Sequence, residues 1–187
     1  EKKVKALLPR LLYMLGADRV WVIQYHNGIS DWLYGSMRFE LCGENAHSIK
    51  EQYDNFHLSW LNLPDYLKTH NQFIGNLTTL EQIDHVMYDR FGKNNVEYLA
   101  CTLLKDDTGT PTGILGFTWE KENEVGYEDS TIKENLIRYG AIIEQYIKSN
   151  INFFNRGQCV EYLDYIIITV NKRHKSLTEY CYDIGNC

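Results

Sequence analysis

Two strand-like stretches separated by a short polar turn constrain this chain most. Residues 96–105 (VEYLACTLLK) and residues 113–120 (GILGFTWE) are rich in apolar, β-branched and aromatic side chains. The intervening residues 106–112 (DDTGTPT) have the composition of a turn. This spacing predicts an antiparallel β-hairpin.

Further elements are expected on either side of this hairpin. Residues 2–15 and 131–149 carry apolar side chains at helical spacing, and Pro9 is expected to kink or restart the first of these helices. Residues 19–26 (RVWVIQYH) and 37–42 (MRFELC) alternate as a second pair of strands. The chain therefore begins and ends this region with a helix.

The middle of the chain, residues 43–93, is less regular. Residues 58–70 are typical of a helix interrupted near Pro64, residues 72–74 of a short strand, and residues 80–91 of one helix. The whole pattern predicts an α/β (α+β) fold with a central antiparallel sheet flanked by N- and C-terminal helices.

We expect residues 1–150 to form one domain and residues 151–187 to form a C-terminal appendage. The appendage has too small an apolar core to fold alone, and its segment 162–170 (YLDYIIITV) suits either a strand or a buried helix. Three cysteines cluster there, which allows a disulfide without requiring one: Cys159, Cys181 and Cys187.

Composition excludes some partners. A net charge of -6 argues against binding to a nucleic-acid backbone, which needs a basic face. No apolar run approaches the roughly 20 residues of a membrane span. The cysteines and histidines show no metal-binding spacing, and we predict no cofactor. The chain starts at Glu1 rather than Met, so a trimmed or processed product is one interpretation, and a membrane tether upstream is compatible with it. The sequence does not indicate the localisation.

The order of elements over residues 2–149 resembles that of GAF and PAS-type sensor domains. The segment CTLLKDDTGTPTGILGFTWE resembles the late GAF hairpin, whose turn carries Asp and Gly and whose second strand begins with Gly. The resemblance implies a ligand between the sheet and the helical middle, where the family holds cyclic nucleotides, tetrapyrroles or small metabolites. The cysteine patterns of bilin attachment and of GAF-type methionine sulfoxide reductases are not evident.

A narrower stretch resembles the soluble domain of T-even-like phage holins. It consists of Tyr98-x-x-Cys101, Gly113 and Trp119, followed by the closing helix. This resemblance implies an N-terminal membrane helix, lesions in the inner membrane that time lysis, and an antiholin partner. The chain departs from the pattern because it continues well beyond the closing helix and shows no membrane helix.

Eight residues are candidates for a ligand site: His26, Asn27, Trp32, Tyr34, Arg38, Glu40, Trp60 and Thr102. A capped turn explains His26 and Asn27 as well as a ligand clamp does. Regular strand alternation places Arg38 and Glu40 on one face, as an ion pair or as a grip on an anionic or amide-bearing ligand. The aromatic candidates suit either the wall of a ring-binding pocket or simple packing.

Catalysis is not expected. Cys101 fits a packed core thiol, and a Cys101–His26 dyad would need mutual contact and a third orienting group. The predicted function is a non-catalytic GAF-like sensory domain, part of a longer protein, that binds a small ligand or a regulatory protein. The alternatives are a holin-like lysis protein and a phage protein that sequesters a nucleotide. A homodimer through the terminal helices also stays open.

Overall fold

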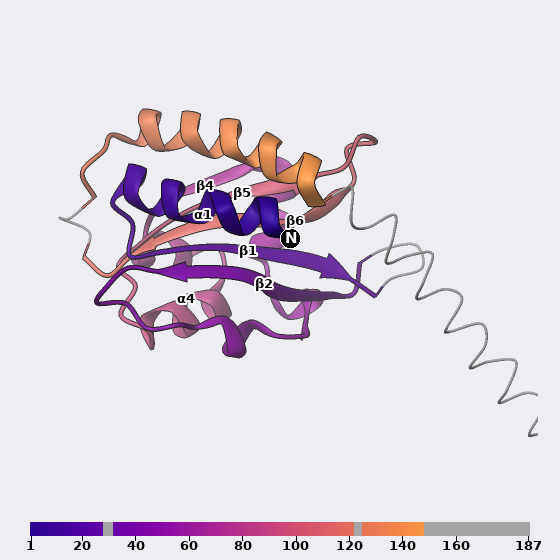
Figure 1. Cartoon of the computed structure of the whole chain (residues 1–187). Coiled ribbons are helices and arrows are strands. Elements are labelled where there is room, and N and C mark those ends of the chain that lie inside the picture. Colours follow the sequence, from indigo (N-terminus) through magenta and orange to yellow (C-terminus); the bar gives the residue numbers. More distant parts are fainter. Residues whose placement is uncertain (28–31, 122–124, 148–187) are drawn as a thin grey trace, which may run out of the picture. The chain divides into compact units, whose positions relative to one another are not determined.

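The computed structural model describes residues 1–27, 32–121 and 125–147. They form one antiparallel sheet with the strand order β3-β2-β1-β6-β5-β4 (Figure 1). The appendage expected over residues 151–187 lies outside these residues, as do its three cysteines. The strands are β1 Arg19–His26, β2 Tyr34–Cys42, β3 Phe56–His57, β4 Gln72–Asn76, β5 Tyr98–Lys105 and β6 Pro111–Trp119.

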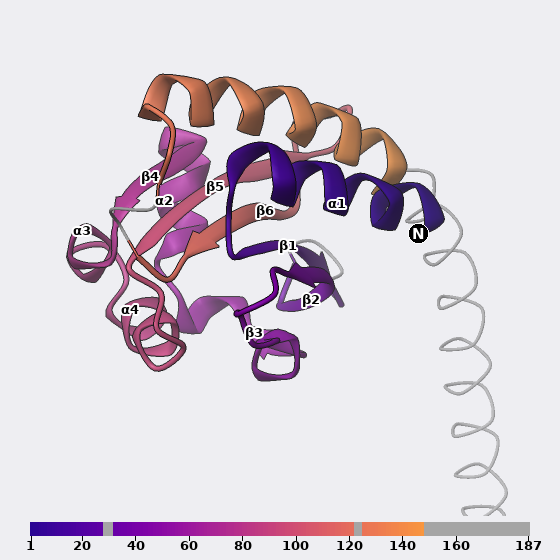
Figure 2. The ribbon, with the colours of Figure 1, turned by 60° about the vertical axis from the view of Figure 1, so that its left-hand side comes forward.

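Helices cover both faces of the sheet. Figures 1 and 2 show α1 beside the closing helix, residues 129–147, on one face. The shorter helices and the two 3-10 turns pack on the other face, which confirms the predicted α/β class. The helical elements before the closing helix are α1 Lys2–Leu15, η1 Lys50–Tyr53, η2 Leu58–Trp60, α2 Leu63–His70, α3 Leu77–Glu81 and α4 His85–Gly92.

Both predicted strand pairs are confirmed. In the late hairpin, Tyr98 lies opposite Trp119 and Lys105 lies opposite Pro111. On β6, Gly116 leaves room for the Trp21 ring, because a Cβ at Gly116 would lie 2.1 Å from Cζ2 of Trp21. The absence of a side chain at this glycine therefore leaves space for one of the two fully buried tryptophans.

The two prolines have different effects. Pro9 lies inside α1, which continues from Lys2 to Leu15 without restarting, and a stripe of buried residues packs on both sides of it: Val4, Leu8, Leu11 and Leu15. The interruption expected near Pro64 is present, because η2 ends at Trp60 and α2 begins at Leu63 with Pro64 in its first turn. A proline is tolerated in the first turn because its missing N–H needs no partner there.

The single helix expected over residues 80–91 is wrong, because Asp84 divides it. This buried carboxylate caps α4 by accepting from the N–H of Met87 at 2.9 Å. Its other oxygen accepts from the N–H groups of Asn62 and Leu63, each at 2.7 Å, at the start of α2. One aspartate thus begins two helices.

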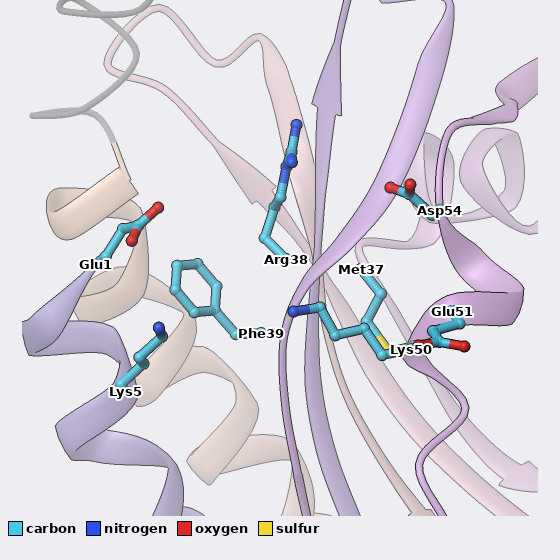
Figure 3. Close-up of a pocket in the computed structure, with 8 residues that line it drawn as sticks. All are labelled: Glu1, Lys5, Met37, Arg38, Phe39, Lys50, Glu51 and Asp54. Atoms are coloured by element: carbon cyan, nitrogen blue, oxygen red, sulfur yellow. The ribbon is translucent and has the colours of Figure 1, made fainter.

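A β-bulge interrupts β2 at Arg38. Val22 of β1 lies opposite Phe39, whereas the next residue, Ile23, lies opposite Met37, so Arg38 has no partner on β1. Met37 joins the core beneath the short helices, and Phe39 lies on the side of α1 (Figure 3). The regular alternation assumed from the sequence therefore fails here.

A buried ion pair joins the start of β1 to the residue that follows β6. Arg19 is 1% exposed, and its Nη2 lies 2.6 Å from Oε1 of Glu120, just beyond β6. Its Nε donates to the carbonyl oxygen of His47 at 2.7 Å, and Nη2 lies 3.5 Å from that of Asn94. One guanidinium therefore joins the sheet to two loops on the face of the short helices.

Candidate functional site

A pocket of about 570 Å³ lies along β2, at the bulge. We call it the β2 pocket. Three elements contribute to it: the first turns of α1, the strand β2, and the segment that contains η1 (Figure 3). Its size is in the range of small-molecule sites. Its lining residues are Glu1, Lys5, Met37, Arg38, Phe39, Lys50, Glu51 and Asp54.

Charges of both signs line this pocket. Its cations are Lys5, Arg38 and Lys50, and its acids are Glu1, Glu51 and Asp54. Within the part of the chain that the structure describes, none of the six forms an ion pair. Their charges are therefore available to a ligand.

His26 lies near this pocket, at the end of β1. Burial lowers the pKa of His26, and the neighbouring Arg38 lowers it further, while hydrogen bonding to Asn27 and the charge of Asp54 raise it. The Oγ of Ser36 accepts from the N–H of Asn55 at 2.8 Å and lies 2.9 Å from Nε2 of His26. A neutral imidazole that accepts the Ser36 proton satisfies this arrangement.

The lowered pKa of His26 predicts that the fold loses stability in acid. In the unfolded chain His26 takes up its proton at the ordinary pKa of 6.5, which lies above its pKa in the folded state. The free energy of unfolding is therefore highest above pH 6.5 and decreases as the pH falls below that value. Melting temperatures at about pH 7.5 and about pH 5.5 should differ less in His26→Gln than in the parent. His85→Gln, at an exposed site on α4, should keep the parental difference; equal slopes in all three proteins would contradict the assignment.

Aromatic rings extend from His26 along the same edge of the sheet. The ring of His26 stacks with Tyr34 at 6.3 Å, and Tyr34 meets His57 edge-on at 5.1 Å. His57 lies 6.0 Å from Trp60, whose side chain is 63% exposed. Together with Asn27 and Arg38, five of the eight candidate residues therefore lie in this one region.

The interior between the sheet and the short helices contains stacked side chains. Phe91 of α4 stacks on Trp21 at 6.0 Å and on Tyr53 at 5.6 Å, and all three are fully buried. Trp32 packs against this core rather than facing the β2 pocket. The resemblance implies a ligand in this layer, and these rings occupy it.

The last two candidates lie elsewhere. Glu40 accepts from the N–H of Ile49 at 2.9 Å, from the Ser48 hydroxyl, and from the N–H of Lys50 at 3.3 Å. It therefore fixes the entry to η1. Thr102 is buried on β5, where its Cγ2 lies against Gly140 of the closing helix, so it is on the opposite face of the sheet from the short helices.

Cys101 lies in the core with no exposed surface. Burial raises the pKa of this thiol to about 12. The thiolate, which is the nucleophilic form, is therefore suppressed near neutral pH. His26 bonds to Ser36 and Asn27 instead.

Sequence reasoning missed the charged residues that surround Arg38. The sequence indicates weakly that Lys5 is exposed, because it lies off the apolar stripe of its helix. It gives no indication that Lys50 and Asp54 lie near β2, since an irregular segment brings them there. Ser36, the partner of His26, was likewise not identified.

Neither a metal centre nor a membrane span is found among the described residues. No group of three or more His, Cys, Asp or Glu side chains in this part of the chain is placed to hold a metal ion. No helix in it has both the length and the apolar character needed to cross a membrane.

Comparison with known proteins finds similar structures but no similar sequences. No protein-family model matches the chain, and no curated protein matches its sequence. A domain of a two-component sensor histidine kinase protein from Sinorhizobium meliloti 1021 superposes with a TM-score of 0.59 at 14% identity, over 83% of this chain and 96% of that one.

Two GAF domains of known structure are similar as well. The phycocyanobilin-bound GAF domain of a cyanobacterial phytochrome gives a TM-score of 0.55 at 14% identity, over 77% of this chain and 84% of that one. GAF3 from Slr1393 of Synechocystis sp. PCC6803 gives 0.56 at 14% identity, over 80% and 96%. These neighbours lend no support to the holin resemblance. The described part of this chain has the GAF fold.

Proposed function

We propose that this chain is a non-catalytic sensory domain that binds a small molecule in the β2 pocket. The observation that carries the proposal is the bulge at Arg38, which places an exposed guanidinium at a pocket of about 570 Å³. A bulge next to a binding site changes the direction of a side chain and leaves one residue of the strand without a pairing partner. The fold of bilin-binding and sensor-kinase domains supports the same class of function.

The position of the pocket suits signalling through the helices. Its wall includes the first turns of α1, which packs beside the closing helix. Lys3 lies 5.2 Å from the centre of the Tyr146 ring, and the Tyr139 hydroxyl donates to Sδ of Met14 at 3.6 Å. A ligand that contacts α1 would therefore bias the position of both helices.

The surroundings of the candidate nucleophiles support the absence of catalysis. Cys101 is protonated in the core, and burial together with the charge of Glu40 raises the pKa of Cys42 as well. Burial lowers the pKa of His26, and its Nε2 lies 2.9 Å from Oγ of Ser36. Within residues 1–27, 32–121 and 125–147, neither Cys42 nor Cys101 is hydrogen-bonded to a base that could activate it.

A thermal-shift screen of small metabolites tests the proposal. A ligand at a hundred times its Kd stabilises the folded state by about 2.7 kcal/mol, or about 5–10 °C for a domain of this size. Arg38→Ala should remove the shift, whereas Arg10→Ala, an exposed arginine elsewhere on α1, should keep it. Shifts that survive in Arg38→Ala, His26→Ala and Asn27→Ala alike would exclude the β2 pocket as the site.

A further inference from the structure

The charge pattern of the β2 pocket narrows the chemical class of its ligand. Three cations and three acids line one pocket, and none of these six is neutralised by an ion pair among the described residues. A purely anionic ligand would meet three carboxylates, and a purely cationic ligand would meet three cations. A ligand with both charges avoids these repulsions.

Arg38 is suited to the negative end of such a ligand. A guanidinium presents a planar set of donors that matches a carboxylate with two parallel hydrogen bonds. The bulge leaves Arg38 without a partner on β1, and the residue is exposed. Figure 3 places it between the charged residues of α1 and those of the η1 segment.

Asp54 is suited to the positive end. It follows η1 in an extended conformation, with φ -97° and ψ 131°, and Figure 3 shows its carboxylate turned toward β2. Arg38 and Asp54 shift the pKa of His26 in opposite directions. Because both residues line the β2 pocket, the two opposite charges are presented to one ligand.

Two of the eight lining residues are apolar. Met37 and Phe39 flank Arg38 in the sequence and line the same pocket, although the bulge turns them toward opposite sides of the sheet. Both are almost fully buried, so each offers little apolar surface to a ligand. The charged side chains therefore dominate the surface that a ligand contacts.

We propose that the β2 pocket binds a zwitterion of the amino-acid class, with its carboxylate on Arg38 and its ammonium on Asp54. This inference rests on the proposed function, because it names the ligand class of the same pocket. The pairs are partly exposed to water, so raising the salt concentration should weaken binding.

A series of amino acids with increasing separation of the two charges tests this proposal. The probes are glycine, β-alanine, γ-aminobutyrate and ε-aminocaproate, titrated into the full chain by calorimetry. Butyrate and butylamine are controls that each carry one charge. One member of the series should bind at least about tenfold more tightly than either control, since each end adds a charge-assisted hydrogen bond.

Variants identify which end binds where. Arg38→Gln should weaken binding of the best zwitterion and of butyrate by about tenfold, and Asp54→Asn should do the same for that zwitterion and for butylamine. Arg10→Gln should leave all affinities unchanged. The comparison of probes on the parent protein needs no variant, so it decides the question even where a substitution impairs folding.

The outcomes separate the ligand class from the site. Butyrate that binds as tightly as every zwitterion would overturn the zwitterion proposal and leave the β2 pocket as an anion site. The zwitterion proposal also fails if no zwitterion binds while another metabolite gives a thermal shift that Arg38→Ala removes. A metabolite whose thermal shift is the same in Arg38→Ala as in the parent protein would instead contradict the proposed function.

Discussion

Replacing Glu120 with alanine should destabilise the domain by about 3 kcal/mol, at the lower end of the cost of breaking a buried ion pair. Arg19 is 1% exposed, so losing its carboxylate partner at 2.6 Å leaves a cation in the core. Glu120 is 24% exposed, so water can offset part of this cost. Urea unfolding would show a lower midpoint with an unchanged slope.

Two further variants separate the effect of the unpaired Arg19 charge from a loss of packing. Arg19→Met in the Glu120→Ala background removes the uncompensated charge and should recover part of the stability. Glu81→Ala removes an exposed acid beside His85 and should change stability by less than about 0.5 kcal/mol. If Glu81→Ala costs as much as Glu120→Ala, the buried pair does not have the role assigned to it.

Replacing Gly116 with alanine should also cost about 3 kcal/mol, near the upper end of the usual penalty for overpacking a core. The new Cβ would lie 2.1, 2.3 and 2.5 Å from three atoms of the Trp21 ring. That ring has no exposed surface and stacks on Phe91, so it cannot simply move away. Thermal or urea unfolding of the variant measures the loss.

A double-mutant cycle assigns this cost to the ring. In the Trp21→Leu background, Gly116→Ala should be much less destabilising, because the clashing atoms are gone. Gly126→Ala is the matched control, since a Cβ there would meet no atom within 4 Å. Additive effects of Trp21→Leu and Gly116→Ala would contradict this explanation.

Local patterns predict most of the fold. The strand predicted over residues 19–26 forms β1 with those bounds, and the strands of the late hairpin begin and end within two residues of their predicted bounds. The errors come from single residues with long-range roles. Asp84 divides one predicted helix because it also caps α2, and no local pattern shows that second contact.

The candidate site is predicted only in part. Asn27, Tyr34 and Arg38 lie near His26 because β1 and β2 are neighbours along the chain, which the sequence indicates. Lys50 and Asp54 come from an irregular segment whose path depends on the hydrogen bonds from Ile49 and Lys50 to Glu40. Thr102 lies on the other face of the sheet because of the register of β5, which only pairing with β4 and β6 determines.

Arg38 is an extra residue in β2, because the pairing of β1 with β2 does not include it. With Arg38 removed, Met37 and Phe39 would be consecutive residues facing opposite sides, as they already do opposite Ile23 and Val22. The pairing of β1 and β2 would then be regular from end to end. A single codon therefore separates the scaffold from the proposed binding function, so an evolving lineage could gain or lose this site without repacking its core.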